Sequence, residues 1–269
     1  MESALGTKLI ERSARIFRLT RAGEVFLDPA KQLLDDVASV KAKLVMADQT
    51  PPMRLRIASV EELDATITAP WLLDLKQTYP NLSLTLSSGA SHENHEALSS
   101  RSVDIMMGVD TVANVDWIEQ FPILRDPFIV VTSANTDAVL TSRPFVRYAS
   151  DLYIGRQIEA QLRRSSLLPP QGFEMTTNQA LFAMTAELDG WAITTALIYL
   201  GTPYAKERLI AQPLPIPRFS RSLALHARAG TLGELPAEIA QRMKHQIAAR
   251  LLPCAKTELS FLGDELSMI

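Results

Sequence analysis

The sequence predicts an α/β fold in which a long helix precedes a two-lobed body. Three observations predict it: an apolar seam after Thr20, a proline-containing break at residues 48–52, and alternating strand-like and helical runs from residue 54 onward. The 269 residues are 47% hydrophobic and 21% charged, which suits one large or two ordinary domains and excludes wholesale disorder. The first residues carry no basic-then-apolar export signal, so we expect a cytoplasmic chain.

The N-terminal segment is basic and leads into the seam of a helix. Within residues 1–21 five basic residues stand against two acidic ones, although the whole chain has a net charge of −3, so this end is where we expect contact with a polyanion. Thr20 is a suitable N-cap, and Pro29 is an anomaly that would bend the helix. The seam has the spacing of coiled-coil a and d positions and predicts pairing of two chains through Phe26, Ala30, Leu33, Val37, Val40 and Leu44.

Two α/β units follow the break. In the first, strand-like and helical runs alternate as Arg54–Ser59, Ile67–Tyr79, Leu82–Leu86, Glu93–Leu98 and Val103–Val109. This strand–helix–strand order predicts a parallel-rich sheet. In the second unit, we expect strands at Pro127–Ser133, Phe145–Tyr148, Trp191–Thr195, Arg208–Leu214 and Ser222–Arg228, and helices at Ile154–Arg164, Asn178–Leu188 and Ala237–Leu252. Two such units joined by short extended segments favour a ligand cleft between them.

Small polar residues lie where the expected strands end. In parallel α/β sheets, ligands bind at this edge, because loops and helix N-termini present free N–H groups there. Ser and Thr also cap helices, so the prediction depends on the whole set converging. Arg147 could pair with a carboxylate, which favours a small organic, anionic effector. The expected effector-binding residues are Ser59, Val60, Ser88, Ser91, Val109, Arg147, Tyr148, Thr176, Thr177, Thr194 and Thr195.

No motif favours an enzyme. The run from His92 to Glu96 resembles the zinc-protease pattern, but its histidines are three residues apart where that pattern needs four, and no third ligand is evident. No nucleophile elbow, phosphate-binding loop or dinucleotide fingerprint is present in the sequence. We therefore expect no catalytic residue, metal or cofactor. The single cysteine, Cys254, is expected to be a small apolar filler.

The N-terminal strings closely resemble the LysR-type transcription regulators. The resemblance rests on residues 5–12 (LGTKLIER) and 18–24 (RLTRAGE), which match the end of that family's winged helix-turn-helix and the start of its linker helix. The family often has a proline where Pro29 stands. More diffuse matches at residues 80–82, 103–105 and 190–193 resemble its effector domain, which is similar to type 2 periplasmic binding proteins. The resemblance implies a DNA-binding regulator that forms dimers or tetramers and responds to a small-molecule effector.

The resemblance also divides the chain. Residues 1–20 would be a remnant of the winged helix-turn-helix, 21–50 the linker helix, and 53–269 the effector domain, with lobe I at about 53–128 and 215–269 and lobe II at about 129–214. Most of the family's recognition helix has no counterpart here, so we expect impaired DNA reading. The residues expected to contact DNA belong to the wing and are Arg12, Ser13, Arg15 and Arg18.

Three alternatives stay open at this level. The chain could be a solute-binding protein of the same two-lobed fold. It could be an enzyme of that fold, dependent on a metal held by His92 and His95. It could also bind its effector and pair with full-length regulators as a decoy that does not bind DNA.

Overall fold

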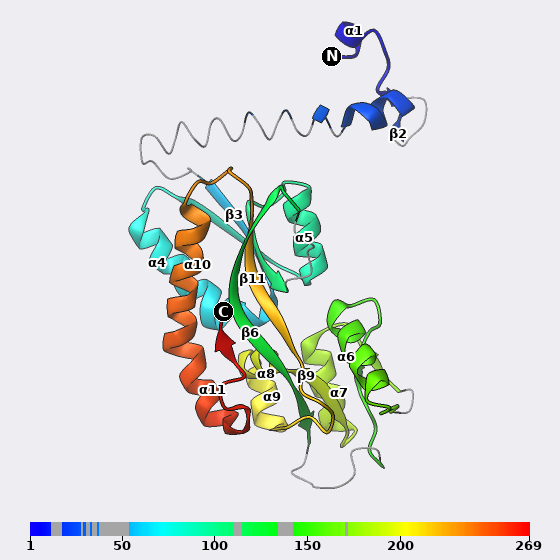
Figure 1. Cartoon of the computed structure of the whole chain (residues 1–269), viewed down its shortest axis with the longest axis vertical. Helices are drawn as coiled ribbons and strands as arrows, with labels where there is room; N and C mark the ends of the chain where they lie inside the picture. Colours follow the sequence, from blue (N-terminus) through cyan, green and yellow to red (C-terminus); the bar gives the residue numbers. More distant parts are fainter. Residues whose placement is uncertain are drawn as a thin grey trace. The chain divides into compact units, whose positions relative to one another are not determined.

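The computed structural model describes residues 1–11, 18–27, 29–30, 33, 37, 54–109, 115–133, 142–169 and 172–269 (Figure 1). These residues divide into two units, which we treat separately. The N-terminal unit comprises Met1–Pro52 with Gly230–Gly233, and the main unit comprises Met53–Ala229 with Glu234–Ile269. No helix in the described ranges is long and apolar enough to cross a bilayer.

The N-terminal unit contains a short helix, a hairpin and the start of a further helix. Helix α1 (Glu2–Leu5) ends at Gly6, whose φ of 63° is left-handed and therefore suits glycine. Strands β1 (Ile10–Glu11) and β2 (Arg18–Leu19) pair antiparallel, as expected for a wing. The Thr20 hydroxyl accepts the backbone N–H of residue 23 at 3.0 Å, so this threonine caps the helix that begins at residue 21.

The expected DNA contacts and dimer seam are only partly described. Arg12, Ser13, Arg15, Val40 and Leu44 lie outside the described residues. Arg18 is exposed on β2, and Phe26 and Ala30 are half-buried in the single chain. Leu33 and Val37 are 64% and 51% exposed, so this part of the seam offers apolar surface to a partner.

Lobe I of the main unit begins with three parallel strands. Strand β3 lies between β4 and β5 and pairs with both in parallel. Strand β5 in turn pairs antiparallel with β11. The five residues of β5 are all buried, as the apolar run predicts. The helix expected from Ile67 begins six residues earlier and contains a π-helical segment. The elements are β3 (Arg54–Ser59), α3 (Glu61–Leu63), π-helix η1 (Asp64–Thr68), α4 (Ala69–Thr78), β4 (Ser83–Ser88), α5 (Ser91–Ser99) and β5 (Ile105–Val109).

Two long antiparallel strands run side by side through the main unit. Strand β6 (Ile118–Thr132) pairs with β11 (Ser220–Arg228) as far as Pro127, and then continues in lobe II between β9 and β10 (Figure 1). The parallel pairing expected for the first unit is found for β3, β4 and β5, whereas every pair formed by β6 or β11 is antiparallel. The sequence indicated only the apolar second half of β6, since the first half is only partly buried.

Lobe II surrounds the far end of β6, and the chain then returns to lobe I. The sequence did not indicate α8, α9, β8 or the C-terminal strand, which are short. The lobe II elements are β7 (Arg147–Tyr148), α6 (Tyr153–Arg164), β8 (Glu174–Met175), α7 (Asn178–Glu187), β9 (Trp191–Thr195), α8 (Ala196–Gly201), α9 (Pro203–Arg208) and β10 (Ile210–Gln212). The returning chain forms α10 (Leu235–Gln246), π-helix η3 (Ile247–Leu251), α11 (Leu252–Glu258), the 3₁₀-helix η4 (Ser260–Leu262) and β12 (Ser267–Met268), which pairs with β6.

Candidate functional site

A cleft of about 790 Å³ lies between the two lobes of the main unit. Lobe I contributes the first turn of α3, the start of η1 and the turn from β4 into α5. Lobe II contributes Tyr148 and the starts of α6 and α7, and Ile198 and Arg221 close the cleft where the lobes meet. The volume falls in the range of small-molecule sites.

The structure brings seven of the expected effector-binding residues into this cleft. They are Val60, Ser88, Ser91, Val109, Tyr148, Thr176 and Thr177. Ser59, Thr194 and Thr195 are fully buried behind the lining. The Ser59 hydroxyl bonds to that of Thr68 at 3.1 Å, and that of Thr194 bonds to the Tyr148 hydroxyl at 3.0 Å. We therefore give these three residues a supporting role.

Arg147 lies outside the cleft lining. Its Nη1 donates to Glu159 Oε1 at 2.9 Å, and its guanidinium group stacks over the Phe145 ring at 5.1 Å from the centroid. Its charge is therefore compensated within lobe II. The expectation of an anionic effector rested on this residue, and the geometry does not support that role.

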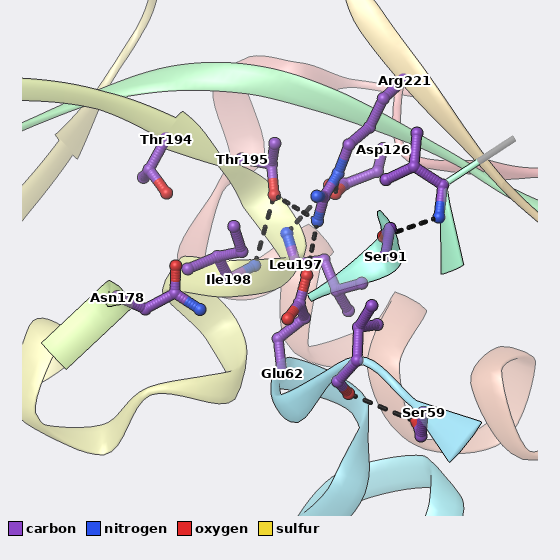
Figure 2. A network of polar contacts seen from close by, with 12 residues as sticks. Ser59, Glu62, Ser91, Asp126, Asn178, Thr194, Thr195, Leu197, Ile198 and Arg221 are labelled. Carbon is purple, nitrogen blue, oxygen red and sulfur yellow. Dashed lines mark hydrogen bonds and ion pairs between the residues drawn. The ribbon is translucent and has the colours of Figure 1, made fainter. Parts of the chain in front are cut away.

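The cation at the cleft is Arg221, which sequence reasoning missed. Its side chain is 5% exposed, and its Nε donates to Asp126 Oδ2 at 2.8 Å. Its Nη2 donates to Glu62 Oε1 at 2.7 Å and to the Thr195 hydroxyl at 3.2 Å (Figure 2). Burial opposes the charged form, but the two carboxylates outweigh it and raise the pKa of Arg221 above its usual value. We call these four residues the hinge cluster.

The hinge cluster joins elements of both lobes. Asp126 lies on β6 and Arg221 on β11, the two strands that run toward lobe II, whereas Glu62 lies on α3 of lobe I. Thr195 and Asp126 also cap α8, because their side chains accept the backbone N–H groups of Ile198 at 3.4 Å and Leu197 at 3.0 Å. In the sequence, Asp126 and Arg221 are charged residues that each stand directly before an apolar, strand-like run. Nothing in the local pattern showed that these two side chains meet.

Lobe I holds its part of the lining through the turn from β4 into α5. The Ser91 hydroxyl accepts the N–H of Val109 at 3.1 Å, and the Asn94 amide donates to the Ser59 carbonyl at 2.9 Å. The Glu93 carboxylate accepts the N–H of Ala90 at 2.8 Å. These bonds tie three neighbouring strand ends together, so the lobe I wall is preorganised.

Lobe II presents hydroxyl and amide groups. The Tyr148 hydroxyl donates to Asn178 Oδ1 at 2.8 Å, and burial raises the pKa of this tyrosine above its usual value, so it stays protonated. The Thr177 hydroxyl caps α7 by accepting the N–H of Ala180 at 3.2 Å. The N-cap of α6, Leu152, has no side-chain acceptor for the first N–H groups of that helix.

The histidines of the near-motif point to different surroundings. His92 lines the cleft, whereas the His95 ring packs edge to face against Trp117 with centroids 6.3 Å apart. In the described part of the chain, no three His, Cys, Asp or Glu side chains form a group that could hold a metal ion.

Comparisons with known proteins identify the fold. Full-length OxyR from Pseudomonas aeruginosa, in a variant form, superposes with a TM-score of 0.67 at 18% identity, over 90% of this chain and 82% of that one. Full-length BenM superposes with a TM-score of 0.60 at 19% identity, over 92% and 84% of the two chains. The two-lobed α/β fold class expected from the sequence is thus confirmed.

Sequence relatives are transcription regulators and not enzymes. LrrA of Synechococcus elongatus, a probable HTH-type transcriptional regulator, is 25% identical over 81% of this chain and 74% of its own. An HTH-type transcriptional repressor of P. aeruginosa is 34% identical over 88 residues, which span 33% of this chain and 28% of the repressor. The model of the LysR substrate binding domain matches residues 48–245. This match covers most of the chain, which therefore belongs to the LysR family.

Proposed function

We propose that this protein is a cytoplasmic transcription regulator whose main unit senses a small effector in the cleft between its lobes. The observation that carries the proposal is the cleft itself, which both lobes line and which ends at the hinge cluster. An effector in this position contacts residues whose relative position depends on the angle between the lobes. It therefore stabilises one arrangement of the lobes over another.

The experiment is a thermal-shift screen of small metabolites followed by calorimetry of the hits. Thr176→Trp fills the cleft from an exposed lining position, and Thr85→Trp is its control, since Thr85 is exposed on β4 away from the cleft. We expect hits to bind the wild type and Thr85→Trp equally and to lose at least tenfold in affinity for Thr176→Trp. Hits that bind both variants equally would place the effector elsewhere and overturn the proposal.

We propose further that two chains pair through the helix that follows Thr20 and present their wings to DNA. Exposed Leu33 and Val37 support the pairing, and exposed Arg18 supports contact with phosphate, which positions a protein without reading sequence. A gel-shift comparison of Arg18→Ala with the wild type on the same DNA fragment tests the contact with phosphate.

Sedimentation tests the pairing. Leu33→Asp combined with Val37→Asp places two charges on each side of the seam and is expected to shift the chain to monomer at micromolar concentration. Val25→Asp is the control, because Val25 is 72% exposed on the same helix but does not belong to the seam. An unchanged sedimentation coefficient for the double variant would contradict pairing by this helix.

A further inference from the structure

We propose that the effector of the cleft is a small organic cation, an amine whose ammonium group lies against carboxylates of the lobe I wall. This proposal rests on the proposed function and names its ligand class. Independently of charge, the cleft and the family match to a substrate binding domain both point to a ligand here. What selects the class is the balance of charge in the lining.

That balance is strongly acidic. Among the described lining residues there is one guanidinium, that of Arg221, and one imidazole, that of His92. Against them stand five carboxylates, which are those of Glu61, Glu62, Asp64, Glu93 and Asp151. Leaving the histidine out of the count, five carboxylates against one guanidinium give the lining an excess of four negative charges. A cleft lined by one sign of charge concentrates ligands of the opposite sign.

Arg221 cannot offset this excess, because its charge is already compensated. Its guanidinium bonds both Glu62 and Asp126, at 2.7 and 2.8 Å, so two carboxylates share one buried cation. An anionic effector would have to approach a cation that carries two partners. It would also have to pass the remaining carboxylates of the lining.

The other four lining carboxylates lack such a partner. Glu61, Asp64, Glu93 and Asp151 form no ion pair with any described residue, whereas other acidic residues of lobe I do, such as Asp104 with Arg56 and Asp74 with Arg242, both at 2.6 Å. A bound ammonium would supply the missing counter-charge.

Among these four carboxylates, that of Asp64 has one oxygen atom without a hydrogen-bond donor in the described ranges. Its Oδ2 accepts the Ser88 hydroxyl, but its Oδ1 is buried and has no hydrogen-bond partner in the described ranges. A buried carboxylate oxygen without a donor costs free energy in the empty protein. An ammonium group carries three N–H donors and would pair the charge of this carboxylate.

Helix N-termini are the counter-argument, since several line the cleft and favour anions. Those of α7 and α8 are capped, by Thr177 and by Asp126 with Thr195, and at the start of α5 the Glu93 carboxylate accepts the N–H of Ala90. A helix N-terminus is equivalent to about half a positive charge, which one carboxylate outweighs. The starts of α3 and α6 have no side-chain cap. The first turn of α3 carries the carboxylates of Glu61 and Glu62, so it is the α6 start, in lobe II, that suits a neutral oxygen of the effector.

Calorimetry with a matched series of four-carbon probes tests the charge class. 1,4-Diaminobutane, 1,4-butanediol and succinate have the same chain length but differ in charge. We expect the diamine to bind the full chain at least tenfold more tightly than the diol or succinate at equal pH and ionic strength. Asp64→Asn should reduce the diamine affinity at least tenfold. The control Glu187→Gln should leave it within twofold, because Glu187 lies at the end of α7 outside the lining.

Three outcomes would overturn the proposal. The first is preferential binding of succinate. The second is equal diamine affinity for the wild type and Asp64→Asn, which would indicate general attraction to an acidic surface. The third is no diamine binding at millimolar concentration. In each case the cleft-filling variant Thr176→Trp distinguishes failure of the cationic effector from failure of the effector cleft. If a metabolite of another charge class binds the wild type and loses affinity for this variant, the cleft binds an effector, but that effector is not a cation.

Discussion

Glu62 and Asp64 belong to the same helical run and line the same cleft, yet their surroundings differ. Glu62 is 7% exposed at the side chain and bonds the buried guanidinium of Arg221. Asp64, two residues further on, has a hydroxyl donor on one oxygen and no partner on the other. The comparison separates two uses of charge in one site: paired charges hold the lobes in register, and unpaired charges remain for a ligand.

The largest expected effect concerns the paired side of this comparison. Asp126→Asn would leave Arg221 paired with Glu62 alone and would place an amide N–H₂ opposite its buried Nε–H, so it should destabilise the main unit by about 1–3 kcal/mol, because a buried donor loses its acceptor. Urea denaturation followed by circular dichroism measures the change. Glu187→Gln is the matched control, since its pair with Arg208 is exposed and should contribute less than about 1 kcal/mol. Equal losses for the two variants would show that the hinge cluster is not specially stabilising.

The hinge cluster also shows where sequence reasoning ends. The apolar strands β3, β5 and β9 follow directly from the local pattern, and seven of the residues expected near strand ends line the cleft. Arg221 and Asp126 meet although they are 95 residues apart, and no local pattern carries that information. Arg147 was the available arginine at a strand end, but a partner on α6, Glu159, takes its charge.

The same reason explains why the sequence did not reveal the antiparallel pairings. A strand–helix–strand order predicts parallel pairing between neighbours in sequence, which holds for β3, β4 and β5. The pairing of β6 with β11 joins residues far apart in the chain, and half of β6 is too exposed to show an apolar run. Pairings of this kind depend on tertiary packing, and local propensity does not reveal them.

An intermediate effect should come from the neutral wall of lobe II. Tyr148→Phe removes a hydroxyl that bonds Asn178 at 2.8 Å and the buried Thr194 at 3.0 Å. We expect a loss of about 1–2 kcal/mol in the free energy of unfolding, because Thr194 loses a partner in a site away from water. The diamine affinity should change much less than in Asp64→Asn if charge recognition belongs to lobe I. A larger loss of affinity in Tyr148→Phe would reverse the roles assigned to the two walls.

The smallest effect has the opposite sign and tests the unpaired side of the comparison most directly. Burial raises the pKa of Asp64 above its ordinary value of 3.8, and the nearby charge of Glu62 adds to this, although the hydrogen bond from Ser88 and the nearby Ser59 hydroxyl oppose it. The folded chain therefore holds this proton at pH values where the unfolded chain has already lost it. It follows that stability falls as the pH rises from 3.8 through the raised pKa.

Asp64→Asn removes that loss, so the empty variant should be more stable than the wild type at pH 7. Because the carboxylate is partly exposed, solvent screening keeps the gain below about 1 kcal/mol. Denaturation at several pH values should show the gain shrinking as the pH is lowered toward the ordinary pKa. A residue that only supports the fold would lose stability on this substitution. If the carboxylate of Asp64 serves the ligand and not the fold, Asp64→Asn should gain stability and bind the diamine more weakly. A loss of stability at pH 7 would instead show that Asp64, like the charges of the hinge cluster, supports the fold.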